Sequence, residues 1–352
     1  MGAHLDAVEE RGQTVVGLLD GPGGRGISVQ RGAGRVQRSW KGRLEAAAVS
    51  VYHNGWGVDL MTPRDPTPVR VCWLHSDFPN LPILIRHCAP YADAFVSVHP
   101  CMQERIRREV SWLPEKRNLL GSCYLPLDPD SLARHAGPRT ELVVGYLGRL
   151  EKTQKRIERL LSFCEIVADR GISLRLEIVG GGRSARWLER KLRGYPFVRF
   201  LGEQDKAAIP GHLARWKYIF FPSSFEGLPL ALLEALAAGV VPIYPDFHEG
   251  KDPLGQPAPA GLYEQGEMLE AIRALMRLED CYNEFYPGFR QRSLDLLQQH
   301  RPQRVAEQHQ QLHTAFQRLR PRQKRQPSSF LTLPPIWYYN RIYRYLTVGA
   351  IY

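Results

Sequence analysis

The chain has 352 residues, of which 43% are hydrophobic and 24% charged, an ordinary globular composition that can bury sizeable cores. At ~150 residues per domain, this length predicts about two domains. The formal net charge of +11 favours anionic partners: nucleotides, phosphates, nucleic acid or an anionic membrane. The lack of any run of about 18 apolar residues excludes a transmembrane helix, and no signal peptide is expected at Met1. The cysteines show neither C-x-x-C nor metal-ligand spacing, which favours free thiols in a reducing cytosol.

The first segment is predicted to belong to a Rossmann-like domain that begins late. Residues 1–12 have the pattern of an amphipathic helix, and residues 14–20 that of a strand. A Rossmann-like domain normally opens with a strand and a glycine-rich turn before its first helix, and that opening is absent here. Either the start codon is misplaced or the domain is shortened. The Gly-rich residues 21–35 lack a G-x-G-x-x-G that leads into an apolar helix, so we expect a basic loop rather than a phosphate cradle.

Three short β-branched or aromatic runs follow, at 49–54, 69–75 and 94–100, with a helix over 101–110. Strands and helices in this alternation predict a parallel sheet. Polar side chains end two of these strands: His53 and Asn54 end one, and His75 with Asp77 ends the next. A lone histidine at a strand end is usually structural, but two such ends point equally to a binding site.

Residues 119–140 contain prolines, glycines and a fading pattern, and are predicted to be an interdomain linker. The α/β alternation then restarts, with strands at 141–148, 174–182 and 198–202 and helices around 155–170 and 184–192. We therefore predict an α/β fold of two Rossmann-like, doubly wound parallel-sheet domains facing across a cleft. The predicted bounds are 1–135 for the N-terminal domain, 136–317 for the C-terminal domain and 318–352 for a basic, aromatic tail.

The segment 218–246 carries the clearest motif of the chain. An apolar strand, YIFF, leads into a loop with Glu226, and Pro229 stands where a helix would begin, since its fixed φ suits a first helical position. The helix LALLEALAA contains Glu234 and ends at Gly239, a predicted left-handed cap. Ligands of open α/β sheets bind at the carboxyl edge, where a helix N-terminus attracts anions.

Two cations and three glycines lie at other strand ends of the second half. Arg149 follows a strand directly, and Lys155 lies at or near the next helix start, where a cation is unfavourable unless an anion binds. A solvated basic turn is the alternative. The run Gly180-Gly181-Gly182 would let the backbone approach a ligand closely.

Four segments of the second half stand in this order: GRLEKTQKR, L-x-IVGGG, VRFLG and FPSSFEGLPLALLEALAAGVVPI. Together they resemble the donor half of the retaining glycosyltransferases of GT-B fold, family 4 type. The resemblance covers residues 141–246 by motif. In residues 1–140 it extends only to the alternation of strands and helices. The spacing E-x7-E, from Glu226 to Glu234, is its most diagnostic element. The missing first strand is a departure from the family. In the family this strand and its glycine turn belong to the half that binds the acceptor, so the departure concerns acceptor binding.

The resemblance implies that a nucleotide-diphosphate sugar binds in the cleft. It places Arg149 and Lys155 on the diphosphate, Glu226 on the donor-sugar hydroxyls and Glu234 on the ribose hydroxyls. Further implied contacts come from the backbone N–H groups of Gly227 and Leu228 to the phosphates, and from His75 to the donor sugar. Two cations with helix N–H groups neutralise a leaving diphosphate without a metal, so we expect no metal and no cofactor beyond the donor substrate.

Beyond residue 250 we expect a loop over 251–266 with a short strand, GLYEQ, and helices at 267–278 and roughly 289–320. RLRPRQKR at 318–325 and the aromatic segment after it are expected to pack back on the first domain. A membrane-surface element is the alternative, because basic residues interleaved with Trp and Tyr suit an anionic interface. Nucleic-acid binding is not expected, since no recognised module is present.

The sequence thus predicts a retaining glycosyltransferase that acts on a saccharide or lipid-linked acceptor, cytoplasmic or peripheral at the inner face of the membrane. Two alternatives remain open. One is another GT-B enzyme of nucleotide sugars, such as an epimerase, and the other is a non-catalytic nucleotide-sugar-binding protein with a degenerate acceptor domain.

Overall fold

The computed structural model describes residues 15–19, 27–32, 35–37, 49–54, 58, 67–98, 100–111, 119–122, 126–134, 139–247 and 261–319. The predicted helix over 1–12, the first part (251–260) of the loop expected over 251–266 and nearly all of the predicted tail, from residue 320 on, lie outside these residues. By its internal contacts the chain divides into two units. Unit 1 comprises Met1–Ser97, Gln103–Gly121 and Ala306–Tyr352, and unit 2 comprises Val98–Met102 and Ser122–Val305.

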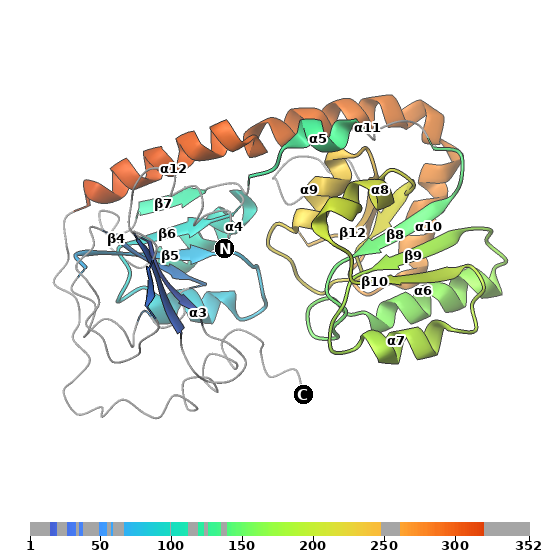
Figure 1. The fold of residues 1–352 in the computed structure, drawn as a ribbon, viewed down its shortest axis with the longest axis horizontal. Coiled ribbons are helices and arrows are strands. Elements are labelled where there is room, and N and C mark those ends of the chain that lie inside the picture. Colours follow the sequence, from blue (N-terminus) through green and yellow to red (C-terminus); the bar gives the residue numbers. More distant parts are fainter. Residues whose placement is uncertain are drawn as a thin grey trace. The chain divides into compact units, whose positions relative to one another are not determined.

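Unit 2 is built on a six-stranded parallel sheet in the order β10-β9-β8-β11-β12-β13 (Figure 1). Numbered within the unit, this is the order 3-2-1-4-5-6 of a doubly wound dinucleotide-type fold. The strands are β8 (Val143–Leu147), β9 (Arg175–Val179), β10 (Val198–Gly202), β11 (Tyr218–Phe220), β12 (Val241–Pro245) and β13 (Gly261–Tyr263). The prediction of an α/β fold with two Rossmann-like parts is confirmed.

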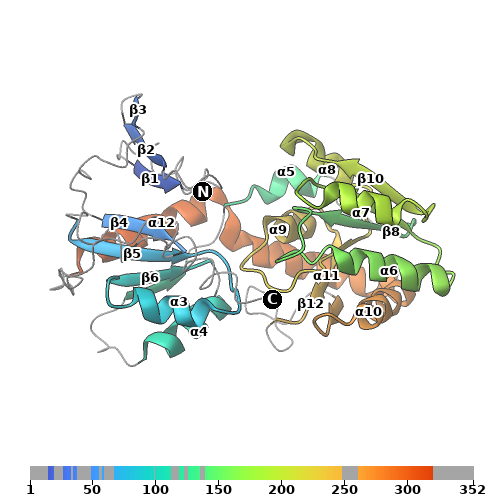
Figure 2. The same cartoon turned by 90° about the horizontal axis from the view of Figure 1, so that it is seen from below.

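Helices cover both faces of this sheet. Helix α6 (Glu158–Asp169) packs against α7 (Ala185–Leu192) and α10 (Met268–Asp280) on one face. Helix α9 (Leu230–Ala237) packs against α11 (Tyr282–Leu297) and α5 (Pro129–Ala133) on the other, as Figures 1 and 2 show. Short helices at Lys206–Ala208 (η2) and Ile209–Leu213 (α8) precede β11. The predicted strands of this half and the helices predicted around 155–170, 184–192 and 267–278 are thus confirmed, each within a few residues.

The centre of the sheet is fully buried, as its apolar sequence predicts. Tyr218, Ile219 and Phe220 of β11 are each at most 1% exposed, which fits a parallel strand covered on both faces. Burying a side chain of this size stabilises the fold by about 1.5–3 kcal/mol. Gly145 of β8 is required beside this strand, because a Cβ there would lie 2.0 Å from the ring of Trp216.

Unit 1 contains a four-stranded sheet in the order β4-β5-β6-β7, whose β4–β5 and β5–β6 pairs are parallel. The strands are β4 (Val49–His53), β5 (Val69–Leu74), β6 (Ala94–Ser97) and β7 (Leu119–Ser122). Helices α3 (Leu81–Cys88) and α4 (Pro100–Val110) follow β5 and β6 (Figure 2). Helix α12 (Pro302–Gln317) begins in unit 2 and belongs to unit 1 from Ala306 on.

Four sequence predictions need correction. The Gly-rich residues 21–35 are not simply a loop: Ile27–Gly32 form β2, which pairs antiparallel with β1 (Val15–Leu19) and with β3 (Arg35–Gln37). The alternating β-branched residues Ile27 and Val29 supply the strand pattern that the glycines obscure. The predicted linker 119–140 contains β7 and α5, so it is only partly a connection.

The other two concern prolines. Pro229 is the N-cap of α9, with an extended ψ of 127°, rather than its first helical residue. The single helix predicted over 289–320 is two helices, α11 and α12, with a 3-10 turn at Gln298–His300 (η3) between them. Pro302 explains the break, because its ring disfavours helical geometry in the preceding residue and fits the first position of a new helix. Gly239 has a φ of 71° and confirms the predicted left-handed cap.

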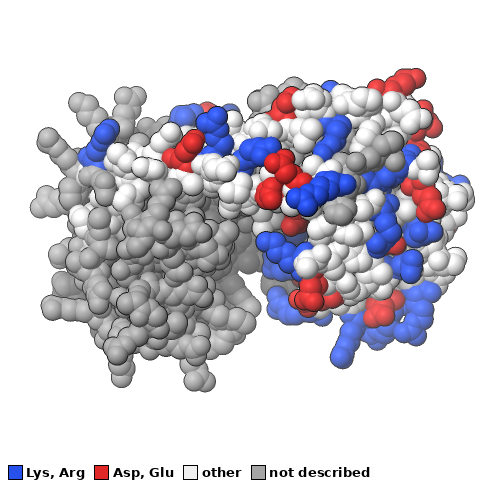
Figure 3. Space-filling view, turned by 45° about the horizontal axis from the view of Figure 1, so that its top comes forward, with Lys and Arg blue, Asp and Glu red and all other residues white. Residues whose placement is uncertain are grey.

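Two further observations concern the described residues as a whole. None of their helices combines the length and the apolar character that crossing a bilayer requires. Within the same ranges, no three or more His, Cys, Asp and Glu side chains gather in a way that could hold a metal ion. On the face of the molecule in Figure 3, described Lys and Arg residues are interspersed with Asp and Glu.

Candidate functional site

The predicted donor-side residues meet where the strand order of unit 2 reverses. Strands β8 and β11 are neighbours in the sheet, although two other strands separate them in the sequence. The loop after β8 carries Arg149 and Lys155, and the loop after β11 carries Glu226. Because parallel strands end at the same edge, both loops rise at the topological switch point, where open α/β sheets bind ligands.

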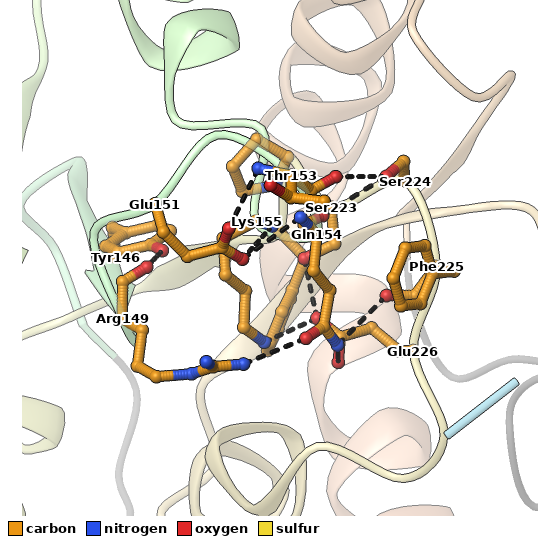
Figure 4. Close-up of polar contacts among 12 residues, drawn as sticks. Tyr146, Arg149, Glu151, Thr153, Gln154, Lys155, Ser223, Ser224, Phe225 and Glu226 are labelled. Atoms are coloured by element: carbon orange, nitrogen blue, oxygen red, sulfur yellow. Dashed lines mark hydrogen bonds and ion pairs between the residues drawn. The ribbon is translucent and has the colours of Figure 1, made fainter. Parts of the chain in front are cut away.

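Glu226 is a buried carboxylate with three side-chain donors around it (Figure 4). Its Oε1 atom lies 2.5 Å from Lys155 Nζ and accepts a hydrogen bond of 2.6 Å from Ser223 Oγ. Its Oε2 atom accepts from Gln154 Nε2 at 3.1 Å. Glu226 is 4% exposed and Lys155 14%, so the ion pair is shielded from solvent and stronger than a surface pair.

Arg149 is exposed and is joined to the same cluster through Gln154. Its Nη2 donates to Gln154 Oε1 at 2.9 Å, and the backbone oxygen of Arg149 accepts from Tyr146 Oη at 2.8 Å (Figure 4). Burial, reinforced by the nearby charges of Glu226 and Glu151, raises the pKa of Tyr146 above its ordinary value. Tyr146 is therefore a neutral hydrogen-bond donor that fixes the start of this loop.

The loop itself is folded around a second carboxylate, Glu151. This side chain accepts hydrogen bonds from the backbone N–H groups of Thr153, Gln154 and Lys155, at 2.8 to 3.0 Å. Helix α6 begins only at Glu158, so Lys155 lies in the loop before the helix rather than in its first turn. The capping-type bonds to Glu151 hold the backbone that aims Lys155 at Glu226.

Gly180 and Gly182, after β9, allow a close approach of two loops, and the approach of backbone to a ligand stays a prediction. A Cβ on Gly180 would lie 1.9 Å from the backbone oxygen of Gly148, and one on Gly182 would lie 2.6 Å from that of Leu150. Both glycines also have positive φ angles, of 142° and 147°. The hydrogen bond from Leu150 N to Gly181 O, 2.7 Å long, closes this contact beside Arg149.

Helix α9 brings the second glutamate of the E-x7-E motif. Gly227 and Leu228 lie between Glu226 and the N-cap Pro229, and both are buried. The N-cap Pro229 has no side-chain acceptor, so it leaves the first N–H groups of α9 to other acceptors. Glu234 lies within the helix and is half-buried, and burial raises the pKa of its carboxyl, opposed only by the charge of Lys206.

The predicted strand-end residues of unit 1 also come together. His53 ends β4 and His75 follows β5, and their Nδ1 and Nε2 atoms lie 2.6 Å apart. Asn54, whose φ is 52°, accepts a 2.8 Å hydrogen bond from the backbone N–H of His75. Burial lowers the pKa of His53 to about 4 and, with the charge of His53 as second cause, that of His75 to about 3. Both rings are thus neutral at pH 7.

Sequence reasoning missed three residues of this site: Gln154, Ser223 and Glu151. Gln154 bonds Glu226 in the other loop, and Ser223 bonds Glu226 within its own loop. Glu151 holds the backbone of its own loop, and no periodicity of the sequence reports contacts of either kind. Gln154 and Ser223 do stand beside Lys155 and Glu226 in their strand-end loops, which is a usable signal. His53, Asn54 and His75 belong to unit 1 and the remaining site residues to unit 2, and each group is described within its own unit.

Comparisons with known proteins bear on the family of unit 2 and on the fold. Residues 141–277 match a family model described as "Glycosyl transferases group 1". A GDP-mannose-dependent alpha-(1-6)-phosphatidylinositol dimannoside mannosyltransferase from Mycobacterium tuberculosis is 33% identical over 108 residues. That match covers 30% of this chain and 28% of the relative, so the chain aligns with less than a third of the relative's length.

Solved structures extend the likeness to the fold of most of the chain. The pneumococcal O-GlcNAc transferase GtfA, in complex with UDP and GlcNAc, gives a TM-score of 0.63 at 13% identity, over 88% of this chain and 66% of its own. Sucrose-phosphate synthase from Thermosynechococcus elongatus gives 0.59 at 18% identity, over 76% and 73%. Residues 141–277 are therefore similar to the glycosyl transferases group 1 family, within a chain that has the GT-B fold.

Proposed function

We propose that this protein is a retaining glycosyltransferase that moves a sugar from a nucleotide-diphosphate donor to a saccharide or lipid-linked acceptor. The observation that carries the proposal is the convergence of Arg149, Lys155 and Glu226 at the switch point of a glycosyl transferases group 1 domain. A diphosphate needs cations and N–H donors, and a sugar needs a fixed carboxylate for its hydroxyls. This edge of the sheet offers both.

The diphosphate is assigned to Arg149, Lys155 and the start of α9. Arg149 is exposed, and a guanidinium can hold two phosphate oxygens at once. The backbone N–H groups of Gly227 and Leu228, with the uncapped first turn of α9, add donors and a positive dipole end. These groups stabilise the negative charge that develops on the leaving diphosphate, so the proposed mechanism has no step that needs a metal or a further cofactor.

The two glutamates are assigned to the donor's sugars. Glu226 Oε2 accepts a single hydrogen bond from the described residues, that of Gln154, which leaves lone-pair capacity for a hydroxyl of the transferred sugar. No hydrogen bond joins the Glu234 side chain to another described residue. Its carboxylate is proposed to accept hydrogen bonds from the ribose hydroxyls. The neutral His75 of unit 1 is proposed to contact the donor sugar.

The nature of the substrates follows from the relatives as a proposal. The mycobacterial relative is named for a GDP-mannose donor and a phosphatidylinositol glycan acceptor, and the pneumococcal structure holds UDP and GlcNAc. We therefore propose a nucleotide sugar and a glycan or lipid-linked acceptor as partners, and a cytoplasmic enzyme that associates with the inner face of the membrane. The net charge of +11 favours such an anionic surface.

The test is transfer from a panel of nucleotide sugars, with the anomeric configuration of the product read by NMR. The proposal expects a product whose anomeric configuration equals that of the donor, and no transfer by Glu226→Gln, which keeps the shape of the side chain. An inverted product would contradict retention. Epimerised sugar without transfer would favour the epimerase alternative, and nucleotide binding without turnover the non-catalytic one.

A further inference from the structure

The carboxamide of Gln154 lies between the two charged groups of the candidate site. Its Oε1 accepts from Arg149 Nη2 at 2.9 Å, while its Nε2 donates to Glu226 Oε2 at 3.1 Å and to Phe225 O at 3.3 Å (Figure 4). A guanidinium only donates and a carboxylate only accepts, so these partners fix which end of the amide faces which group. One neutral side chain thus connects a cation after β8 with an anion after β11.

The backbone of Gln154 is held as firmly as its side chain. Its N–H donates to Glu151 Oε1 at 3.0 Å. Its backbone oxygen accepts from Ser224 N at 2.8 Å and from Ser224 Oγ at 3.3 Å. Gln154 is therefore tied to both strand-end loops by main chain and side chain together, and it cannot turn away without breaking contacts in each loop.

We propose that Gln154 is a positioning residue that couples Arg149 to Glu226, a role that rests on the proposed function of this site. Arg149 is exposed, and an exposed arginine samples many rotamers that a ligand must then restrict. The bond to Gln154 selects one rotamer before the diphosphate arrives, which lowers the entropy lost on binding. The opposite end of the amide fixes the plane of the Glu226 carboxylate for the sugar.

The matched substitution is Gln154→Met, which keeps the length and volume of the side chain but removes both hydrogen bonds. We expect the Kd of the protein for UDP or GDP, titrated separately in a calorimeter, to rise about tenfold for whichever nucleotide binds, the value of one charge-assisted hydrogen bond. The control is Gln204→Met, a partly buried glutamine whose amide bonds Leu201 O, and this variant should leave the Kd unchanged.

A double-mutant cycle separates positioning from a general loss of structure. If Gln154 acts through Arg149, then Gln154→Met should change the Kd hardly at all in a chain that already carries Arg149→Gln. The same tenfold change in both backgrounds would overturn the proposal, because the effect would then not pass through Arg149.

A second cycle needs no ligand and tests the bridge itself. Urea unfolding of unit 2 is followed by hydrogen exchange of its amides. We expect the factor by which Gln154→Met raises the unfolding equilibrium constant to be about tenfold smaller when Glu226→Ala is already present. Equal costs in the two backgrounds would refute the bridge. If the wild-type chain binds neither UDP nor GDP, the proposed function fails in the first experiment, while this second cycle still decides whether Gln154 couples the two loops.

Discussion

The ion pair between Lys155 and Glu226 predicts an unequal response to removing its two members. In Lys155→Met the carboxylate of Glu226 stays buried, 4% exposed, with only the neutral donors of Ser223 and Gln154 left. Leaving a buried charge without its counter-ion costs about 3–5 kcal/mol of unfolding free energy. In Glu226→Gln the ammonium that remains is 14% exposed and on a flexible stem, so it regains water and the cost is about 1–2 kcal/mol.

The assay is urea denaturation resolved by hydrogen exchange, because a chain of two units need not unfold in one step. Amides of β8, β11 and α9 report on unit 2. The double variant Lys155→Met/Glu226→Gln should be more stable than Lys155→Met alone, since it no longer buries an unpaired charge. Equal destabilisation by the two single variants, or additive effects in the double variant, would refute the reasoning that the pair is buried and coupled.

Three further outcomes are expected. Gly180→Ala should destabilise unit 2 by about 1–3 kcal/mol in thermal unfolding, because its Cβ would meet Gly148 O at 1.9 Å; Gly171→Ala, with φ of 62° and no atom near its Cβ, controls for backbone strain alone. Lowering the pH from about 6.5 toward 4 should destabilise unit 1, because His53 and His75 bind protons in the unfolded chain but stay neutral in the folded one. The unfolding free energy should fall by up to about 1.4 kcal/mol per pH unit for each ring. The variant His53→Asn/His75→Asn should flatten this slope, and an unchanged slope would contradict the low pKa values. Glu234→Ala should weaken nucleotide binding by about 1–3 kcal/mol in calorimetry, while adenine, uracil or guanine bases without ribose should bind both proteins alike; unchanged nucleotide affinity would exclude the ribose role.

Much of unit 2 can be predicted from the sequence because its buried strands are continuous apolar runs bounded by turn residues. The run from Tyr218 to Phe221 and the cap at Gly239 need only local chemistry to be recognised. Placing Glu226 beside Lys155 needs one further step, namely that strands β8 and β11 are neighbours, which follows from the doubly wound order once the fold is recognised.

What the sequence could not show are contacts between residues whose separation is irregular. Gln154 meets Glu226 across 72 positions, and its place beside Lys155 in a strand-end loop is the one local signal that it is more than a solvated residue. The β2 strand is hidden by glycines that favour turns, and the pairing of His53 with His75 depends on the register of two strands. Residues that position others are set by tertiary contacts, and so they are the ones that a motif leaves out.

The central claim is that the switch point of unit 2 binds the diphosphate of a nucleotide sugar through Arg149 and Lys155. Its most direct measurement is a calorimetric titration of the wild-type chain and of Arg149→Gln/Lys155→Met with UDP and with GDP. The account predicts that the wild type binds one of them and that the double variant loses this affinity while unit 2 stays folded by hydrogen exchange. Equal affinity of a folded double variant for the same nucleotide would contradict the account.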